Sequence, residues 1–97
     1  MFIQTEATPN PATLKFLPGR DVLKSGTADF KSAGEAGTSP LAQRLFQIDG
    51  VKGVFLGADF ISVTKAEPTA WAHLKPAILG TIMEHYLSGA SVVDGGG

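Results

Sequence analysis

The chain contains no cysteine. It can therefore form neither a disulfide nor a thiolate metal site, and it has no thiol nucleophile. A metal cluster held through cysteine is excluded for these residues on the same ground. The composition suits a reducing compartment such as the cytoplasm.

Charge is scarce and nearly balanced. Charged residues make up 18% of the chain, and the formal net charge is −1. The lysines and arginines stand singly between residues 15 and 75 and form no basic stripe. Proteins that bind nucleic acid through its phosphates need clustered cations. The sequence therefore predicts no nucleic-acid partner.

Long apolar runs are also missing. No run approaches the roughly 18 residues that a membrane span requires, so no membrane contact is expected. The first residues lack the basic segment and apolar run of a secretory signal, and they read as a strand instead. We expect a bacterial cytoplasmic protein whose sequence starts at its fold, with a mature mitochondrial protein as the alternative.

The length of 97 residues fits one domain. A chain of this size can bury one modest core without disulfides or metals. We expect the domain to occupy residues 1–93. The glycine-rich residues 94–97 are expected to be the start of a linker or an added tail.

Alternating apolar and polar residues predict two hairpins. Residues 2–7 and 12–17 form the first, and the prolines between them make a stiff connection. Residues 51–65 form the second, with turn chemistry at Gly57-Ala58-Asp59. Residues 22–30 are less regular: Val22 and Leu23 predict a brief strand, and Thr27, Ala28 and Phe30 predict the start of another. Residues 31–38, rich in glycine, serine and alanine, predict a mobile loop.

Two helices are predicted from caps and apolar periodicity. Ser39 can cap the first and Pro40 suits its first position, so a helix of about ten residues is expected before Gly50. The second runs to Gly89, and Pro76 predicts either a kink or a separate first turn. Its apolar face consists of Trp71, Leu74, Ile78, Ile82 and Tyr86.

The order of these elements predicts an α+β fold. It should contain a small antiparallel sheet, made of two hairpins plus a short strand, covered by two helices on one face. Most large aromatic residues are expected in the core; these are Phe2, Phe46, Phe55, Phe60 and Trp71.

The two histidines do not have the spacing of metal ligands. His73 and His85 are twelve residues apart and lie about 120° apart around one helix, whereas helical ligands are normally three or four residues apart. Glu84 points about 100° away from His85 for the same reason. We interpret both histidines as part of a solvated polar face.

No other motif indicates catalysis. The chain lacks the G-x-S-x-G nucleophile motif. Gly50, Gly53 and Gly57 lack the spacing of a phosphate-binding loop, so we assign them structural roles. The carboxylates are dispersed, without a pair placed to push two pKa values apart. The residues therefore predict that the chain is not an enzyme.

Four segments, in order along nearly the whole chain, match a known pattern. They are MFIQTEATPNPATLKFLPG at the start, GTADF at 26–30, SPLAQRLFQIDGVKGVFLGADFISVTK at 39–65 and WAHLKPAILGTIMEHYLSG at 71–89. Together they resemble the N-terminal domain of Nfu/NifU-type iron–sulfur cluster scaffold and carrier proteins. Several separated segments that agree in order are far more specific than one short motif.

The resemblance implies a role in assembling an iron–sulfur cluster or delivering it to client apoproteins. In the family the cluster is held by a C-x-x-C motif on a separate C-terminal domain. No residue of this chain can take over that role, because cysteine is absent. The cluster is therefore expected on a separate C-terminal domain, and no catalytic, cofactor-binding or metal-binding residue is expected here.

We therefore predict an accessory domain that acts by contacting other proteins. Expected partners are the cysteine-bearing C-terminal domain of the same protein and either client apoproteins or an upstream scaffold. The isolated domain is expected to be monomeric. Binding residues tend to gather on loops displayed by a rigid scaffold. The candidate partner surface comprises Pro9, Asn10, Pro11, Lys52 and Asp59.

Two other functions stay open. A weak iron site could use Glu84, His85 and Asp59, because iron accepts carboxylate and imidazole ligands. A small hydrolase would need a triad assembled from distant residues around His73 or His85. The first requires the three side chains to converge, and the second requires a pocket lined by a histidine.

Overall fold

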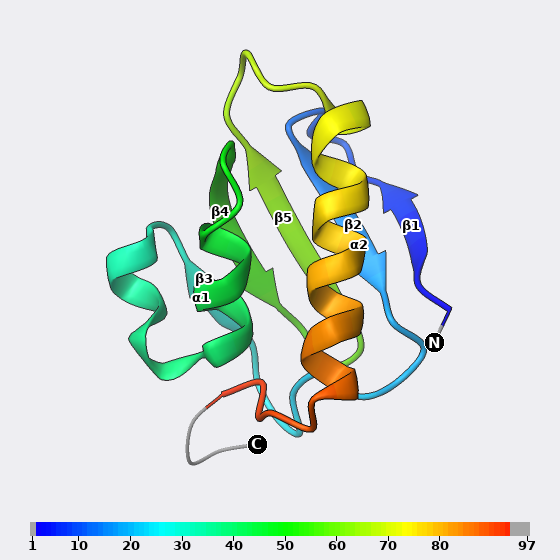
Figure 1. Ribbon diagram of the computed structural model, residues 1–97, viewed down its shortest axis with the longest axis vertical. Coiled ribbons are helices and arrows are strands. Elements are labelled where there is room, and N and C mark those ends of the chain that lie inside the picture. Colours follow the sequence, from blue (N-terminus) through cyan, green and yellow to red (C-terminus); the bar gives the residue numbers. More distant parts are fainter. Residues whose placement is uncertain (1, 94–97) are drawn as a thin grey trace.

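The structure is a computed structural model that describes residues 2–93. In it, a five-stranded antiparallel sheet is covered on one face by helices (Figure 1), which confirms the predicted α+β class. The strand order is β1-β2-β5-β4-β3. The strands are β1 Gln4–Ala7, β2 Thr13–Leu17, β3 Ala28–Phe30, β4 Val51–Leu56 and β5 Ile61–Lys65. The helices are the 3-10 helix η1 Ala33–Thr38, α1 Pro40–Phe46 and α2 Trp71–Leu87.

Both predicted hairpins are confirmed. β1 pairs with β2, β4 pairs with β5, and the two hairpins join where β2 pairs with β5. The short strand β3 pairs with β4 at the far edge. β1 begins at Gln4 instead of Phe2, and Phe2 is 77% exposed. The expectation that Phe2 lies in the core was therefore wrong.

The core lies between the sheet and the two α-helices. Period-two alternation along the strands and the apolar stripes of the helices bring these side chains together. The fully or almost fully buried members include Phe16, Leu41, Leu45, Val54, Leu56, Ile61, Val63, Leu74, Ile78 and Ile82. Phe46 and Trp71 are only partly buried and pack against the edge of this cluster.

Helix α1 starts as predicted but is shorter. The Ser39 hydroxyl accepts a hydrogen bond from the Ala42 amide at 3.0 Å, and Pro40 occupies the first turn. The helix spans seven residues and not about ten. The Gln47 amide already bonds back to the Arg44 carbonyl, the short-range pattern that tightens a last helical turn. Gly50, at φ +100°, then directs the chain into β4.

Helix α2 runs through Pro76 as one segment of 17 residues. Proline removes the amide that would bond to the Ala72 carbonyl. Both residues are exposed, so water can satisfy that carbonyl. The separate first turn, one of the two predicted arrangements, is therefore absent, while the kink at Pro76 stays a prediction.

The segment between β2 and α1 differs most from the prediction. Val22 and Leu23 form no strand; they are buried, and their amides donate to the Ala58 carbonyl at 2.7 and 3.3 Å. The predicted loop at 31–38 contains η1, which lies against α1 and β3. Ala36 is fully buried there and belongs to the core cluster.

The chain folds back after α2. Gly89, at φ +74°, follows the helix, and Val92 is 8% exposed. The Ser39 hydroxyl donates to the Val92 carbonyl at 2.6 Å, which fixes this return to the start of α1. Residues 94–97, where a linker or tail was expected, lie outside the described residues. No helix in the described range is long and apolar enough to cross a membrane.

Candidate interaction surface

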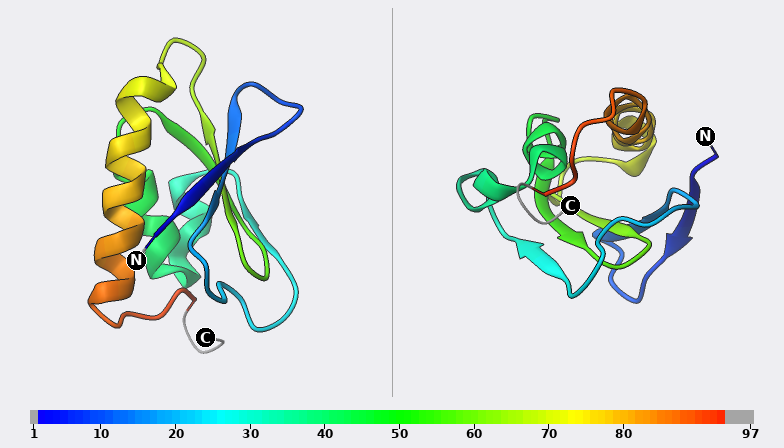
Figure 2. Two further views of the ribbon diagram at one scale, coloured as in Figure 1. Left: turned by 90° about the vertical axis from the view of Figure 1, so that its right-hand side faces the viewer. Right: turned by 90° about the horizontal axis from the view of Figure 1, so that it is seen from below.

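Figure 2 shows that η1, α1 and α2 all lie on one side of the sheet. We call the opposite side the outer face. Strand register places one row of outward side chains across all five strands. This row is Glu6, Lys15, Ser62, Phe55 and Asp29.

An aromatic stack lies on the outer face. The Phe55 and Phe60 rings stack with centroids 5.9 Å apart, and Lys15 Nζ lies 4.3 Å from the Phe60 centroid. The Phe60 ring also covers Gly57, where an added Cβ would overlap it. Both phenylalanines are half-buried. They were expected in the core, but the alternation that buries Leu56 and Ile61 turns them outward.

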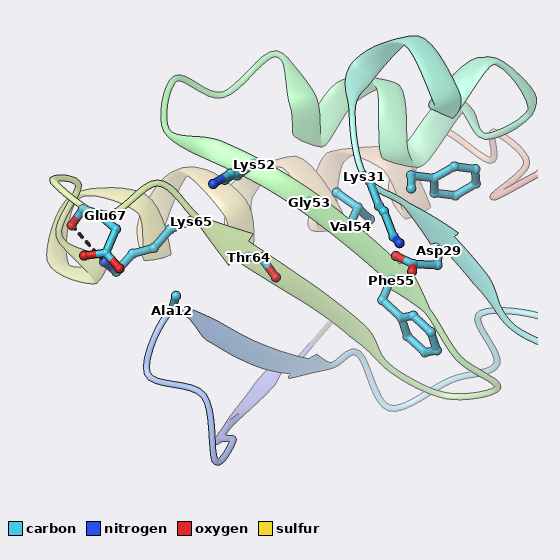
Figure 3. A pocket seen from close by; sticks show the side chains of 11 residues that line it. Ala12, Asp29, Lys31, Lys52, Gly53, Val54, Phe55, Thr64, Lys65 and Glu67 are labelled. Carbon is cyan, nitrogen blue, oxygen red and sulfur yellow. Dashed lines mark hydrogen bonds between the residues drawn. The ribbon is translucent and has the colours of Figure 1, made fainter.

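A hollow of about 300 Å³ opens beside this stack (Figure 3). Gly53 lies in its middle, and Phe55 and Thr64 line it. Around it stand three lysines and two carboxylates, so its lining carries a net positive charge within a chain of net charge −1. The charged residues are Lys31, Lys52, Lys65, Asp29 and Glu67.

Lys52 lies at an irregularity in β4. Val51 pairs with Lys65 and Gly53 pairs with Thr64, so Lys52 is an extra residue in the strand. Such a bulge re-aims the side chain of the inserted residue. Lys52 is exposed and lines the hollow.

The turn between β1 and β2 is held by its own hydrogen bonds. Asn10 Oδ1 accepts from the Ala12 amide at 2.9 Å, and the Asn10 amide donates to Thr8 Oγ1. Trp71 Nε1 donates to the Pro11 carbonyl at 3.0 Å, which ties the turn to the start of α2. Pro9, Asn10 and Pro11 are exposed, but the Asn10 side chain already has a structural role.

The five predicted surface residues do not form one surface. Residues 9–11 and Lys52 lie at one end of the sheet, where the Lys65 amide donates to the Ala12 carbonyl at 2.8 Å. Asp59 lies at the other end, in the turn between β4 and β5 (Figure 1). There it borders a separate hollow with Phe2, Leu17 and Asp21.

His85 is buried, and the interpretation that it is solvated was wrong; His73 is exposed as predicted. His85 Nε2 lies 2.9 Å from the Ser91 carbonyl, so the neutral ring donates there. Burial lowers the pKa of His85, and the Arg44 charge lowers it further, against the opposing effect of the Ser91 hydrogen bond. Its position three residues after Ile82 continues the apolar stripe of α2, and this spacing was the missed signal.

The alternative sites are not assembled. Asp59 borders one hollow and Glu84 another, while His85 is fully buried and its Nε2 is engaged by the Ser91 carbonyl. Within residues 2–93 no group of three or more His, Asp or Glu side chains is placed to hold a metal ion. No histidine lines the hollow over Gly53, as the predicted hydrolase would require of its pocket.

Comparison with known proteins finds relatives that match nearly the whole chain. A family model described as "Scaffold protein Nfu/NifU N terminal" matches residues 3–89. The chain is 54% identical over 94 residues to the human "NFU1 iron-sulfur cluster scaffold homolog, mitochondrial", covering 96% of this chain and 37% of that protein. It is 51% identical over 89 residues to the Arabidopsis thaliana "NifU-like protein 5, mitochondrial", covering 92% and 32%.

Solved structures agree on the fold. The solution NMR structure of a NifU-like protein from Saccharomyces cerevisiae superposes with a TM-score of 0.84 at 30% identity, covering 97% of this chain and 85% of that one. A Staphylococcus aureus protein, SAV1430, gives a TM-score of 0.73 at 23% identity, covering 84% and 99%. The chain spans about a third of the length of the curated relatives that it matches.

Proposed function

The chain belongs to the Nfu/NifU N-terminal scaffold-protein family, and on that premise we propose that it is the accessory, protein-contacting domain of an iron–sulfur cluster assembly and delivery protein. It holds no cluster itself. Its task is to bring a cluster-bearing domain and a client apoprotein, or an upstream scaffold, into contact.

One observation carries this proposal: the family builds iron–sulfur scaffolds, yet this domain lacks the ligands for a cluster. It has no cysteine, and no group of three other candidate ligands converges in the part that the structure describes. A domain without ligands can contribute to delivery through its surface. Two exposed features are available for contact, the turn at residues 9–11 and the outer face with Lys52.

The relatives also bear on partners and location. They extend well beyond the matched region, which supports a cysteine-bearing domain elsewhere in the same protein as one partner. Their names place them in mitochondria, which favours the mitochondrial alternative over the bacterial cytoplasm that the sequence suggested. The family description names a scaffold and no enzyme, and we propose no catalytic residue.

The test is to delete residues 1–93 from the full-length protein. Cluster content per protein and the rate of cluster transfer to an apoprotein are then measured. The proposal predicts unchanged cluster content and slower transfer, because the ligands remain and a docking contact is lost. A parallel fall in cluster content would place ligands in this domain, and unchanged transfer would remove its role in delivery.

A further inference from the structure

Gly53 is a glycine that the fold itself does not require. It lies inside β4, and it is not among the glycines with positive φ. A Cβ at this position would meet the Phe30 carbonyl oxygen and Thr64 Cβ at 3.6 Å, which is ordinary van der Waals contact. Gly57 differs, because the Phe60 ring occupies the space of its missing side chain.

Glycine inside a strand has a cost. It loses more backbone entropy than other residues and offers no side chain to pack. A glycine inside a strand often marks a bulge or the close approach of another chain or ligand. Gly53 follows the bulge at Lys52, but its φ is not positive and a Cβ would fit, so the bulge does not require glycine and close approach is the reason that fits. The hollow over Gly53 lies on the outer face, where such an approach is open (Figure 3).

The charges around Gly53 specify what would approach. Lys31 and Lys52 are exposed on the rim of the hollow, while Lys65 Nζ lies 3.5 Å from the Glu67 carbonyl oxygen. Phe55 supplies an apolar wall. A matching ligand therefore has carboxylates for the lysines and an apolar side chain for the wall, on a backbone thin enough to cross Gly53.

We propose that the hollow over Gly53 is the docking site for an extended acidic segment of a partner protein, with carboxylates at Lys31 and Lys52 and an apolar side chain against Phe55. This inference rests on the proposed function and names the surface that would carry it. The proposed site includes Lys52, which had been suggested by an expected loop position alone. It adds Lys31, Gly53 and Phe55.

Nucleic acid fits the same hollow less well. With Asp29 and Glu67 beside the three lysines, the lining has a net charge of only +1, which suits a few peptide carboxylates but not the continuous run of phosphates of a nucleic acid, which needs clustered cations. The Phe55 and Phe60 rings stack on each other with planes 17° apart, and Lys15 lies over Phe60. Phe60 is therefore engaged by both neighbours and is not a free platform for stacking bases.

The test is selection of a random dodecapeptide phage library on the 97-residue chain. Fluorescence anisotropy then gives the affinity of the enriched peptides, and a fluorescent oligothymidine measures binding of nucleic acid. Enriched peptides are expected to combine Asp or Glu with an apolar residue. Their binding should weaken with added salt, because the contact is partly ionic.

Two variants locate the site. Gly53→Val fills the hollow with a β-branched side chain that suits a strand, and we expect it to weaken peptide binding about tenfold or more. Lys31→Glu with Lys52→Glu should do the same. The matched control is Lys24→Glu with Lys75→Glu, which makes the same charge change outside the hollow and should leave the affinity unchanged. Thermal melting shows that each variant is folded.

The outcomes separate cleanly. The proposal is overturned if no peptides are enriched or if the enriched peptides lack acidic residues. It is also overturned if the peptides bind the Lys31/Lys52 variant and its control with equal affinity, whatever Gly53→Val does to folding. Oligothymidine binding that the Lys31/Lys52 variant abolishes would assign the hollow to nucleic acid instead. If domain deletion slows cluster transfer while the hollow variants bind peptide normally, the proposed function stands and this site fails.

Discussion

Replacing Ser39 by alanine tests the hydrogen bonds that join the start of α1 to the end of the described chain. The hydroxyl is fully buried; it accepts from the Ala42 amide and donates to the Val92 carbonyl. Loss of a helix N-cap costs about 1 kcal/mol. Leaving the Val92 carbonyl without its buried donor costs about 1–3 kcal/mol more. We expect Ser39→Ala to lower the free energy of unfolding by about 2–4 kcal/mol.

Urea denaturation followed by circular dichroism measures this change. The control is Ser32→Ala, because Ser32 precedes η1 but is exposed and makes no capping bond. Its expected effect is within about 0.5 kcal/mol. A domain of this size has about 5–15 kcal/mol of stability, so the difference between the two variants is readily resolved. Equal effects of the two substitutions would refute the assigned role of the Ser39 hydroxyl.

Two further predictions concern single residues. Because burial lowers the pKa of His85 below its ordinary 6.5, the unfolded state binds more protons just below pH 6.5, and stability falls as the pH drops from that value toward the folded-state pKa. His85→Gln, which can still donate to the Ser91 carbonyl, should reduce this acid sensitivity; a pH profile equal to that of the parent in urea denaturation would contradict this. Gly57→Ala should destabilise by about 1–3 kcal/mol, because its Cβ overlaps the Phe60 ring, whereas Gly53→Ala should stabilise by up to about 1 kcal/mol. A reversed order of their melting temperatures would show that the packing around the two glycines is misassigned.

The sequence predicted the elements whose signals are local. Alternation around Phe16 located β2, and the Ser39-Pro40 pair located the start of α1. The antiparallel pairing within each hairpin was predicted from the turn residues between its two strands. These signals depend on residues close together in the chain, so they can be read without knowing the tertiary structure.

What the sequence did not predict depends on contacts between distant segments. Val22 and Leu23 are buried through amide bonds to the Ala58 carbonyl, a contact 35 or more residues away in the chain. Ala36 and its neighbours look like a loop by composition, and only packing against α1 and β3 orders them as a helix. Tertiary contacts decide such short segments.

The candidate site was likewise predicted in part from local sequence and missed in part. Lys52 was predicted from an expected loop position; it lies in β4 instead, and it does line a hollow. Lys31 and Phe55 were missed because the outer face exists only once β3, β4 and β5 are paired. Asp59 was grouped with Lys52 because both were expected on loops of the second hairpin, but Lys52 lies near the start of β4 and Asp59 lies beyond its other end.

The central claim, that this domain serves cluster delivery without ligands and by contact through its outer face, is tested most directly in the full-length protein carrying Gly53→Val. Cluster content and the rate of transfer to an apoprotein are measured side by side with the parent. We predict equal cluster content, an unchanged fold of the domain and slower transfer. Transfer at the parental rate by a folded, cluster-loaded variant would contradict the claim that the outer face carries the contact.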